Sequence, residues 1–176
     1  MNGSKALAVL DTSVVLFALS DPEAACDEDA KRQTVAVTDK LVALQKTHRF
    51  GLPAVVVAEL GRDGETEATV AAIISEMPNL SVLALGYEGG LHAACLRQEA
   101  LRKRPQDRTR GAVTYDALVF ATALEHGADC ILTENGEDFR PLLEKSPRPV
   151  EIVVPSDPID ERGQVLLFAG KAKSKP

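Results

Sequence analysis

The sequence predicts a three-layer α/β domain with a short, mainly parallel central sheet flanked by helices. The first apolar segment, Ala6–Leu10, is continuous rather than alternating, which is typical of a strand covered on both faces. Strand-like and helix-like segments then alternate along the chain, as they do in parallel α/β sheets. With 176 residues, 45% of them hydrophobic, the chain suits a single domain with a sizeable core.

Each expected element follows from its local pattern. Apolar or β-branched runs predict strands at Ala6–Leu10, Leu52–Ala54, Leu80–Leu85, Cys130–Thr133, Val150–Val154 and, at an edge, Val165–Phe168. Helical spacing predicts helices at Val14–Leu19, Ala30–His48, Val55–Leu60, Glu65–Glu76, Glu88–Arg104 and Tyr115–His126, with a loop and short helix at Glu134–Glu144. Gly51, Pro78, Pro105 and Gly127 supply the expected stops, and Arg108–Gly111 is expected to be a polar loop. The domain is expected to span residues 1–155, and residues 156–176 to form a C-terminal extension with a basic tail.

Composition limits the setting of the protein. Three widely spaced cysteines without a CxxC pair argue against a disulfide framework or a zinc site, so we expect reduced, mostly buried thiols. No apolar run approaches the ~20 residues of a membrane span. We therefore expect a cytoplasmic protein with no membrane contact.

Four acidic side chains fall where a site is expected. Asp11 directly follows the first strand, and Asp138 comes shortly after the strand at Cys130–Thr133. Asp116 lies at the start of the helix that leads into that strand, and Glu59 lies one turn into an earlier helix. Because sites in open parallel sheets form beyond the carboxyl ends of strands, these groups are expected to converge.

Asp116 is the most informative of the four. It shares a helix face with Val119, Phe120 and Ala123, where an isolated charge is costly to bury. Several acids close together repel one another, and a divalent metal removes that repulsion. Oxygen ligands alone suit Mg²⁺ or Mn²⁺, which can activate water and neutralise a phosphodiester oxygen. The pattern therefore indicates metal-dependent phosphodiester hydrolysis.

Each acid also has a simpler interpretation. Asp11 could cap the following helix, and Asp116 could interact only with a helix N-terminus. Glu59 could face solvent, and Asp138 could be an exposed loop acid.

Four segments in order resemble PIN-domain ribonucleases, and most of all VapC-type toxins of toxin–antitoxin pairs. They are Val9–Val15 with its Asp-Thr-Ser, Pro53–Leu60, Thr114–Ala123 and Ala128–Phe139. The resemblance covers about residues 6–154. It implies a PIN-like nuclease domain: a hydrolase that cleaves single-stranded or structured RNA with Mg²⁺ or Mn²⁺. It also implies a cognate antitoxin and a homodimer, with the helices at Val14–Leu19 and Ala30–His48 as the contact surface.

The resemblance assigns roles residue by residue. Asp11, Glu59 and Asp116 match the first three acids of the family pattern. Members often carry the fourth acid two positions after the strand-ending Thr133, where this chain has Asn135. Either Asp138 supplies that carboxylate or Asn135 binds a water or the metal through its carbonyl. Thr133 is expected to orient the catalytic water or a ligand.

Charge patterning points to a place for the nucleic acid. The net charge is −6, which taken alone argues mildly against such a partner. The segment 97–110 is nevertheless locally basic, with six basic residues against two acidic ones, 6 − 2 = +4. We expect it to guide the RNA backbone; its basic residues are Arg97, Arg102, Lys103, Arg104, Arg108 and Arg110.

Other classes fit less well. A phosphatase of the haloacid-dehalogenase type needs an acid where this chain has Ser13, and a receiver domain needs a Lys in the stretch between Lys103 and Lys145, which has none. The alternative left open is a PIN-like module that binds nucleic acid or protein with weak or no catalysis.

Overall fold

Five parallel strands form the centre of the fold in the computed structural model. The structure describes residues 5–25, 27–62, 67–103 and 108–157. The strand order is β3-β2-β1-β4-β5, and every neighbouring pair is parallel. The strands are β1 (Ala6–Leu10), β2 (His48–Pro53), β3 (Leu80–Leu83), β4 (Cys130–Leu132) and β5 (Glu151–Val153).

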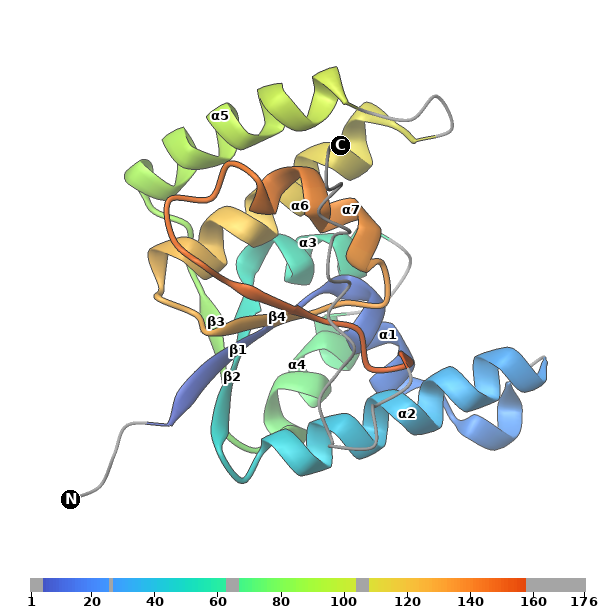
Figure 1. Cartoon of the computed structure of the whole chain (residues 1–176). Coiled ribbons are helices and arrows are strands. Elements are labelled where there is room, and N and C mark those ends of the chain that lie inside the picture. Colours follow the sequence, from blue (N-terminus) through green and yellow to red (C-terminus); the bar gives the residue numbers. More distant parts are fainter. Residues whose placement is uncertain (1–4, 26, 63–66, 104–107, 158–176) are drawn as a thin grey trace, which may run out of the picture.

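Helices cover both faces of this sheet, which confirms the three-layer α/β prediction. In Figure 1, α5, α6 and α7 lie together on one side of the sheet, and α2 and α4 lie on the other. The helices are α1 (Thr12–Leu19), α2 (Glu28–Leu44), α3 (Ala54–Arg62), α4 (Glu67–Glu76), α5 (Tyr87–Arg102), α6 (Arg110–Glu125) and α7 (Gly136–Leu143), with a short 3-10 helix at Pro22–Ala24.

The central position of β1 in the sheet explains why its sequence does not alternate between apolar and polar residues. Residues Leu7 to Leu10 are all buried, because β1 is covered on both faces and paired on both edges. On the α6 side, Phe120 and Phe139 pack with ring centroids 6.4 Å apart, and neither is exposed to solvent. This contact joins α6 to α7.

The expected helix Ala30–His48 is too long at its C-terminal end. Helix α2 ends at Leu44, where the Thr47 N–H closes a turn on the Leu44 carbonyl at 3.0 Å. His48 begins β2 instead, because Ala6 to Val9 of β1 pair with residues 48–51. Gly51 does not stop a helix: it lies in β2, where a Cβ would come within 2.4 Å of Leu83 Cδ1 and could be fitted only if the Leu83 side chain moved.

Helix α6 begins earlier than expected. Arg110 and Gly111 are helical rather than part of a polar loop, because the Thr109 hydroxyl caps the helix by accepting from the Ala112 N–H at 3.1 Å. Asp116 therefore lies in the second turn. A helix-dipole interaction falls off within the first turn, so it does not explain this carboxylate.

Smaller differences concern ends and cysteines. Strand β3 ends at Leu83, two residues before the predicted end, and β4 ends at Leu132. Cys130 is buried and free, whereas Cys95 is exposed, so the expectation of mostly buried thiols is wrong for Cys95. The predicted edge strand, the C-terminal tail, Cys26 and Arg104 lie outside the described residues.

Candidate active site

The acidic residues lie around the point where the sheet order reverses. Successive connections lead from β1 to β2 and β3 on one side, and the chain then returns to place β4 on the other side of β1. Such a switch point leaves a crevice at the carboxyl ends of the strands. Asp11 follows β1 there, its N–H donating to the Leu132 carbonyl of β4 at 3.0 Å, and Thr133 follows β4.

Two hydroxyl groups hold the Asp11 carboxylate. Ser13 Oγ and Thr133 Oγ1 donate to Asp11 Oδ2 at 2.9 Å and 2.8 Å, and Thr133 is fully buried. Asp11 occupies the N-cap position of α1, yet its side chain makes no capping hydrogen bond. The simple capping interpretation therefore fails, because this carboxylate faces the two hydroxyls instead.

Backbone amides fix the direction of those hydroxyls. The Glu134 N–H donates to Ser13 Oγ at 3.1 Å, and the Asn135 N–H donates to Thr133 Oγ1 at 3.0 Å. A hydroxyl has a single hydrogen, so accepting from an amide leaves that hydrogen for the carboxylate. The loop that follows the neighbouring strand, β4, thus aligns Asp11.

Helices α6 and α7 bring in two further carboxylates. Asp116 lies one turn before Phe120 on α6, and Asp138 is next to Phe139 in the first turn of α7. The packing of the two phenylalanines therefore sets how the carboxylates approach each other. Asp138 is half-buried and helical, so it is not an exposed loop acid.

Arg108 lies between these two carboxylates. Its Nη2 donates to Asp116 Oδ2 and also lies 3.1 Å from Asp138 Oδ2. The side chains of Arg108 and Asp116 are each only 16% exposed. The guanidinium is thus a largely buried cation that serves two acids at once.

The electrostatics of Asp116 show that three carboxylates lie near one another. The pKa of Asp116 is raised to about 7: burial raises it most, the charges of Asp11 and Asp138 also raise it, and Arg108 lowers it. The Arg108 ion pair therefore offsets only part of the cost of burying this carboxylate among like charges.

Glu59 is joined to the same group through its neighbour. Thr12 Oγ1 donates to Glu59 Oε2 at 2.5 Å, and Thr12 directly follows Asp11. The Glu59 side chain is half-buried rather than solvent-facing. Asn135 differs: it is exposed, and as the N-cap residue of α7 its side chain makes no capping hydrogen bond.

The basic segment is largely engaged in contacts of its own. Arg97 Nε donates to Thr114 Oγ1 at 2.6 Å, Arg102 lies 3.1 Å from Glu99, and Lys103 pairs with Glu144. Arg108 enters the carboxylate cluster, and Arg110 is exposed at the first position of α6. The role of Arg108 in the cluster was missed from sequence, where nothing separates it from its basic neighbours.

The donor set suits a hard divalent cation in its chemistry. Carboxylate oxygens are the ligands that Mg²⁺ and Mn²⁺ prefer, and a cation already lies against Asp116 and Asp138 in the form of Arg108. Within the described ranges, however, no three or more His, Cys, Asp or Glu side chains are already arranged to hold a metal ion. Metal loading would therefore require these carboxylates to draw together.

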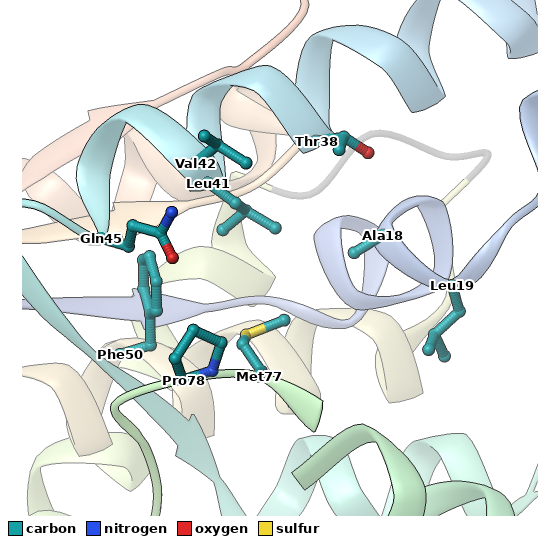
Figure 2. Close-up of a pocket in the computed structure, with 9 residues that line it drawn as sticks. All are labelled: Ala18, Leu19, Thr38, Leu41, Val42, Gln45, Phe50, Met77 and Pro78. Carbon is teal, nitrogen blue, oxygen red and sulfur yellow. The ribbon is translucent and has the colours of Figure 1, made fainter. Parts of the chain in front are cut away.

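A separate apolar pocket of about 220 Å³ lies away from the carboxylates, between α1, α2 and the β2–β3 side of the sheet. Figure 2 shows Phe50, Met77 and Pro78 on one side of it and the α2 side chains on the other. Leu19 and Val42, at its rim, are 42% and 51% exposed. The lining residues are Ala18, Leu19, Thr38, Leu41, Val42, Gln45, Phe50, Met77 and Pro78.

Solved structures share this architecture. A chain of VapBC-1 from nontypeable Haemophilus influenzae superposes with a TM-score of 0.58 and 17% identity, over 86% of this chain and 99% of that one. A chain of VapBC2 from Rickettsia felis bound to a promoter DNA fragment gives a TM-score of 0.56 and 14% identity, over 84% and 97%. A chain of a toxin–antitoxin complex from Klebsiella pneumoniae gives 0.55 and 17%, also over 84% and 97%.

These likenesses establish the fold: the chain has a PIN-like α/β fold, as its sequence predicted. Its counterparts are chains of toxin–antitoxin complexes, and it matches nearly their whole length. No protein-family model and no curated protein matches the sequence. In the described part of the chain, none of the helices combines the length and apolarity needed to cross a bilayer.

Proposed function

We propose that this chain is a Mg²⁺- or Mn²⁺-dependent endoribonuclease that acts as the toxin of a toxin–antitoxin pair. The observation that carries the proposal is the gathering of Asp11, Asp116 and Asp138, from three separate elements, at the switch point of the sheet. A structural role alone gives no reason to place three acids together in a half-buried crevice, because their mutual repulsion is unfavourable. Hydrolysis of a phosphodiester gives that reason, since it needs a concentrated negative site for a metal.

In this proposal Asp11, Asp116 and Asp138 hold the metal, and Glu59 approaches through Thr12. When bound, the metal supplies an activated water and neutralises the charge on the scissile phosphate. Thr133 and Ser13 are positioning residues that hold Asp11 in one orientation through their hydroxyl hydrogens. Because Thr133 is fully buried and aligned by the Asn135 amide, its contribution is rigidity of the acidic site.

Cleavage of labelled single-stranded RNA by the purified protein tests the proposal. The reactions contain Mg²⁺ or Mn²⁺, with and without a chelator, and compare the unaltered protein with Asp11→Asn and Asp116→Asn. We expect metal-dependent cutting that falls by at least about 100-fold in both variants, because each removes a charge that would hold the metal. Asp39→Asn is the matched control, since Asp39 is exposed on α2, which lies on the other side of the sheet from α6 and α7 (Figure 1).

The two classes of outcome separate the nuclease from its alternative. Loss of cutting in both site variants, with Asp39→Asn active, supports the nuclease. No cutting in any metal, by folded protein shown to be free of bound inhibitor, would favour a PIN-like binding module instead. In such a module Arg108 would remain the counter-ion of Asp116 and Asp138, as it is in the structure.

We also propose an antitoxin as partner, with the apolar pocket beside α1 and α2 as its docking place. The comparison chains come from complexes that pair a toxin with an antitoxin. Apolar side chains on these two helices remain exposed, including Leu19 and Val42 at the pocket rim (Figure 2). An apolar segment of a partner would cover them, and the same surface would serve a homodimer.

A further inference from the structure

We propose that Arg108 is a built-in counter-ion that occupies the place of the metal and must leave Asp116 and Asp138 before a divalent ion can bind. This inference rests on the proposed metal site and adds an intramolecular competitor to it. Arg108 is a positioning residue in this sense: it holds the two carboxylates together in the metal-free protein and sets the affinity of the site.

The geometry of the contact carries the argument. A single nitrogen, Arg108 Nη2, lies against Oδ2 of both Asp116 and Asp138. A metal bound by both acids would lie next to the guanidinium, which already takes one oxygen, Oδ2, of each carboxylate. The two cations would also repel each other strongly at this distance in a largely buried site. Guanidinium and metal therefore compete for the two carboxylates.

Burial distinguishes Arg108 from its basic neighbours. Its side chain is 16% exposed, whereas Arg102, paired with Glu99, is 67% exposed. Exposed ion pairs contribute little and exchange readily with solvent, but a buried arginine leaves its partners uncompensated when it departs. The entering metal supplies that compensation, so exchange of one cation for the other is the route that avoids an unpaired acidic cluster.

Arg108 lies just outside the helix that carries Asp116, so it can move independently of that helix. Arg108 immediately precedes Thr109, the N-cap of α6, while Asp116 lies within α6 itself. Arg108 can therefore swing out by local rotation without unfolding the helix that carries Asp116. The departure of Arg108 would then involve Arg108 and Thr109 and leave α6 in place while the carboxylates draw together around the metal.

Mn²⁺ titration in the absence of RNA tests the competition. Isothermal calorimetry and the electron paramagnetic resonance signal of free Mn²⁺ give the dissociation constant for the unaltered protein, Arg108→Gln and Arg108→Lys. We expect Arg108→Gln to bind Mn²⁺ at least about tenfold more tightly, because it removes a positive charge from the position of the metal. Arg108→Lys keeps the charge and should stay within about threefold of the unaltered protein.

Arg102→Gln is the matched control, because it removes the same charge from the same segment at an exposed position. It should change Mn²⁺ affinity by less than about twofold, since solvent and salt screen that charge. Equal or weaker Mn²⁺ binding by Arg108→Gln overturns the inference but leaves the proposed metal site intact. Absence of Mn²⁺ binding by every protein overturns the metal site and the inference together.

A measurement on the unaltered protein covers the case in which Arg108→Gln does not fold. With ¹⁵N-labelled arginine, the Arg108 side-chain resonance is assigned by its disappearance in Arg108→Lys. Addition of Mg²⁺, which is diamagnetic, should move this resonance toward that of a solvent-exposed arginine and leave the Arg102 resonance in place. An Arg108 resonance that does not respond to saturating Mg²⁺ overturns the exchange.

Discussion

Replacing Asp116 with Asn should stabilise the metal-free protein above neutral pH, although most substitutions of a half-buried residue are destabilising. The reason is the pKa of Asp116, which burial and the charges of Asp11 and Asp138 raise to about 7 despite Arg108. The folded state therefore disfavours the ionised carboxylate relative to the unfolded chain. Asn has nearly the same shape and carries no charge, so it avoids this cost.

The size of the effect follows from the shift. The pKa of Asp116 rises from its ordinary value of 3.8 to about 7, and at about 1.4 kcal/mol for each tenfold change in acidity this gives a ceiling of about 4 kcal/mol. We expect about 2 kcal/mol, because Arg108 can adjust and the site retains some contact with solvent. Since the folded-state pKa is raised, the unaltered protein loses this stability as pH rises from about 4 to about 7.

Urea unfolding with a chelator present, at pH 5 and pH 8, measures the difference. Between pH 5 and pH 8 the free energy of unfolding of Asp116→Asn should rise relative to that of the unaltered protein. The difference should persist at higher pH. Asp39→Asn, on the exposed face of α2, should show no such change. A stability difference between variant and unaltered protein that is the same at pH 5 and pH 8 would refute the electrostatic account of the cluster.

Two further outcomes follow from the structure. Thr133→Val should lower RNA cleavage by at least about tenfold with a small change in stability, because it removes the donor to Asp11 but keeps the buried shape; unchanged cleavage at saturating Mn²⁺ would contradict the positioning role. Val42→Asp should abolish co-purification with a co-expressed candidate antitoxin, whereas Val82→Asp, 47% exposed against 51% for Val42 but lying on β3, should not. Retained pairing in Val42→Asp would exclude this pocket as the docking place.

The parts of the fold that depend on local pattern were predictable from sequence. The uninterrupted apolar run of β1 indicates a strand covered on both faces, and α1, α3 and α5 appear close to where capping and spacing place them. The boundary between α2 and β2 was not predictable, because helical spacing continues beyond Leu44 and only pairing with β1 assigns His48 to a strand. The early start of α6 depends on one hydroxyl cap at Thr109, a signal that lies next to several competing polar residues.

The sequence by itself determined which acids could form a site, because Asp11 and Asp116 each stand beside apolar segments that had to be buried. Only the tertiary structure decided how they are compensated. The packing of Phe120 against Phe139 sets Asp116 near Asp138. Arg108 contacts both acids, although in the sequence nothing distinguishes it from the other basic residues of the segment 97–110. Arg108 is the counter-ion because its side chain is buried beside the two acids. That burial arises from the packing of segments distant in sequence, which no local pattern encodes.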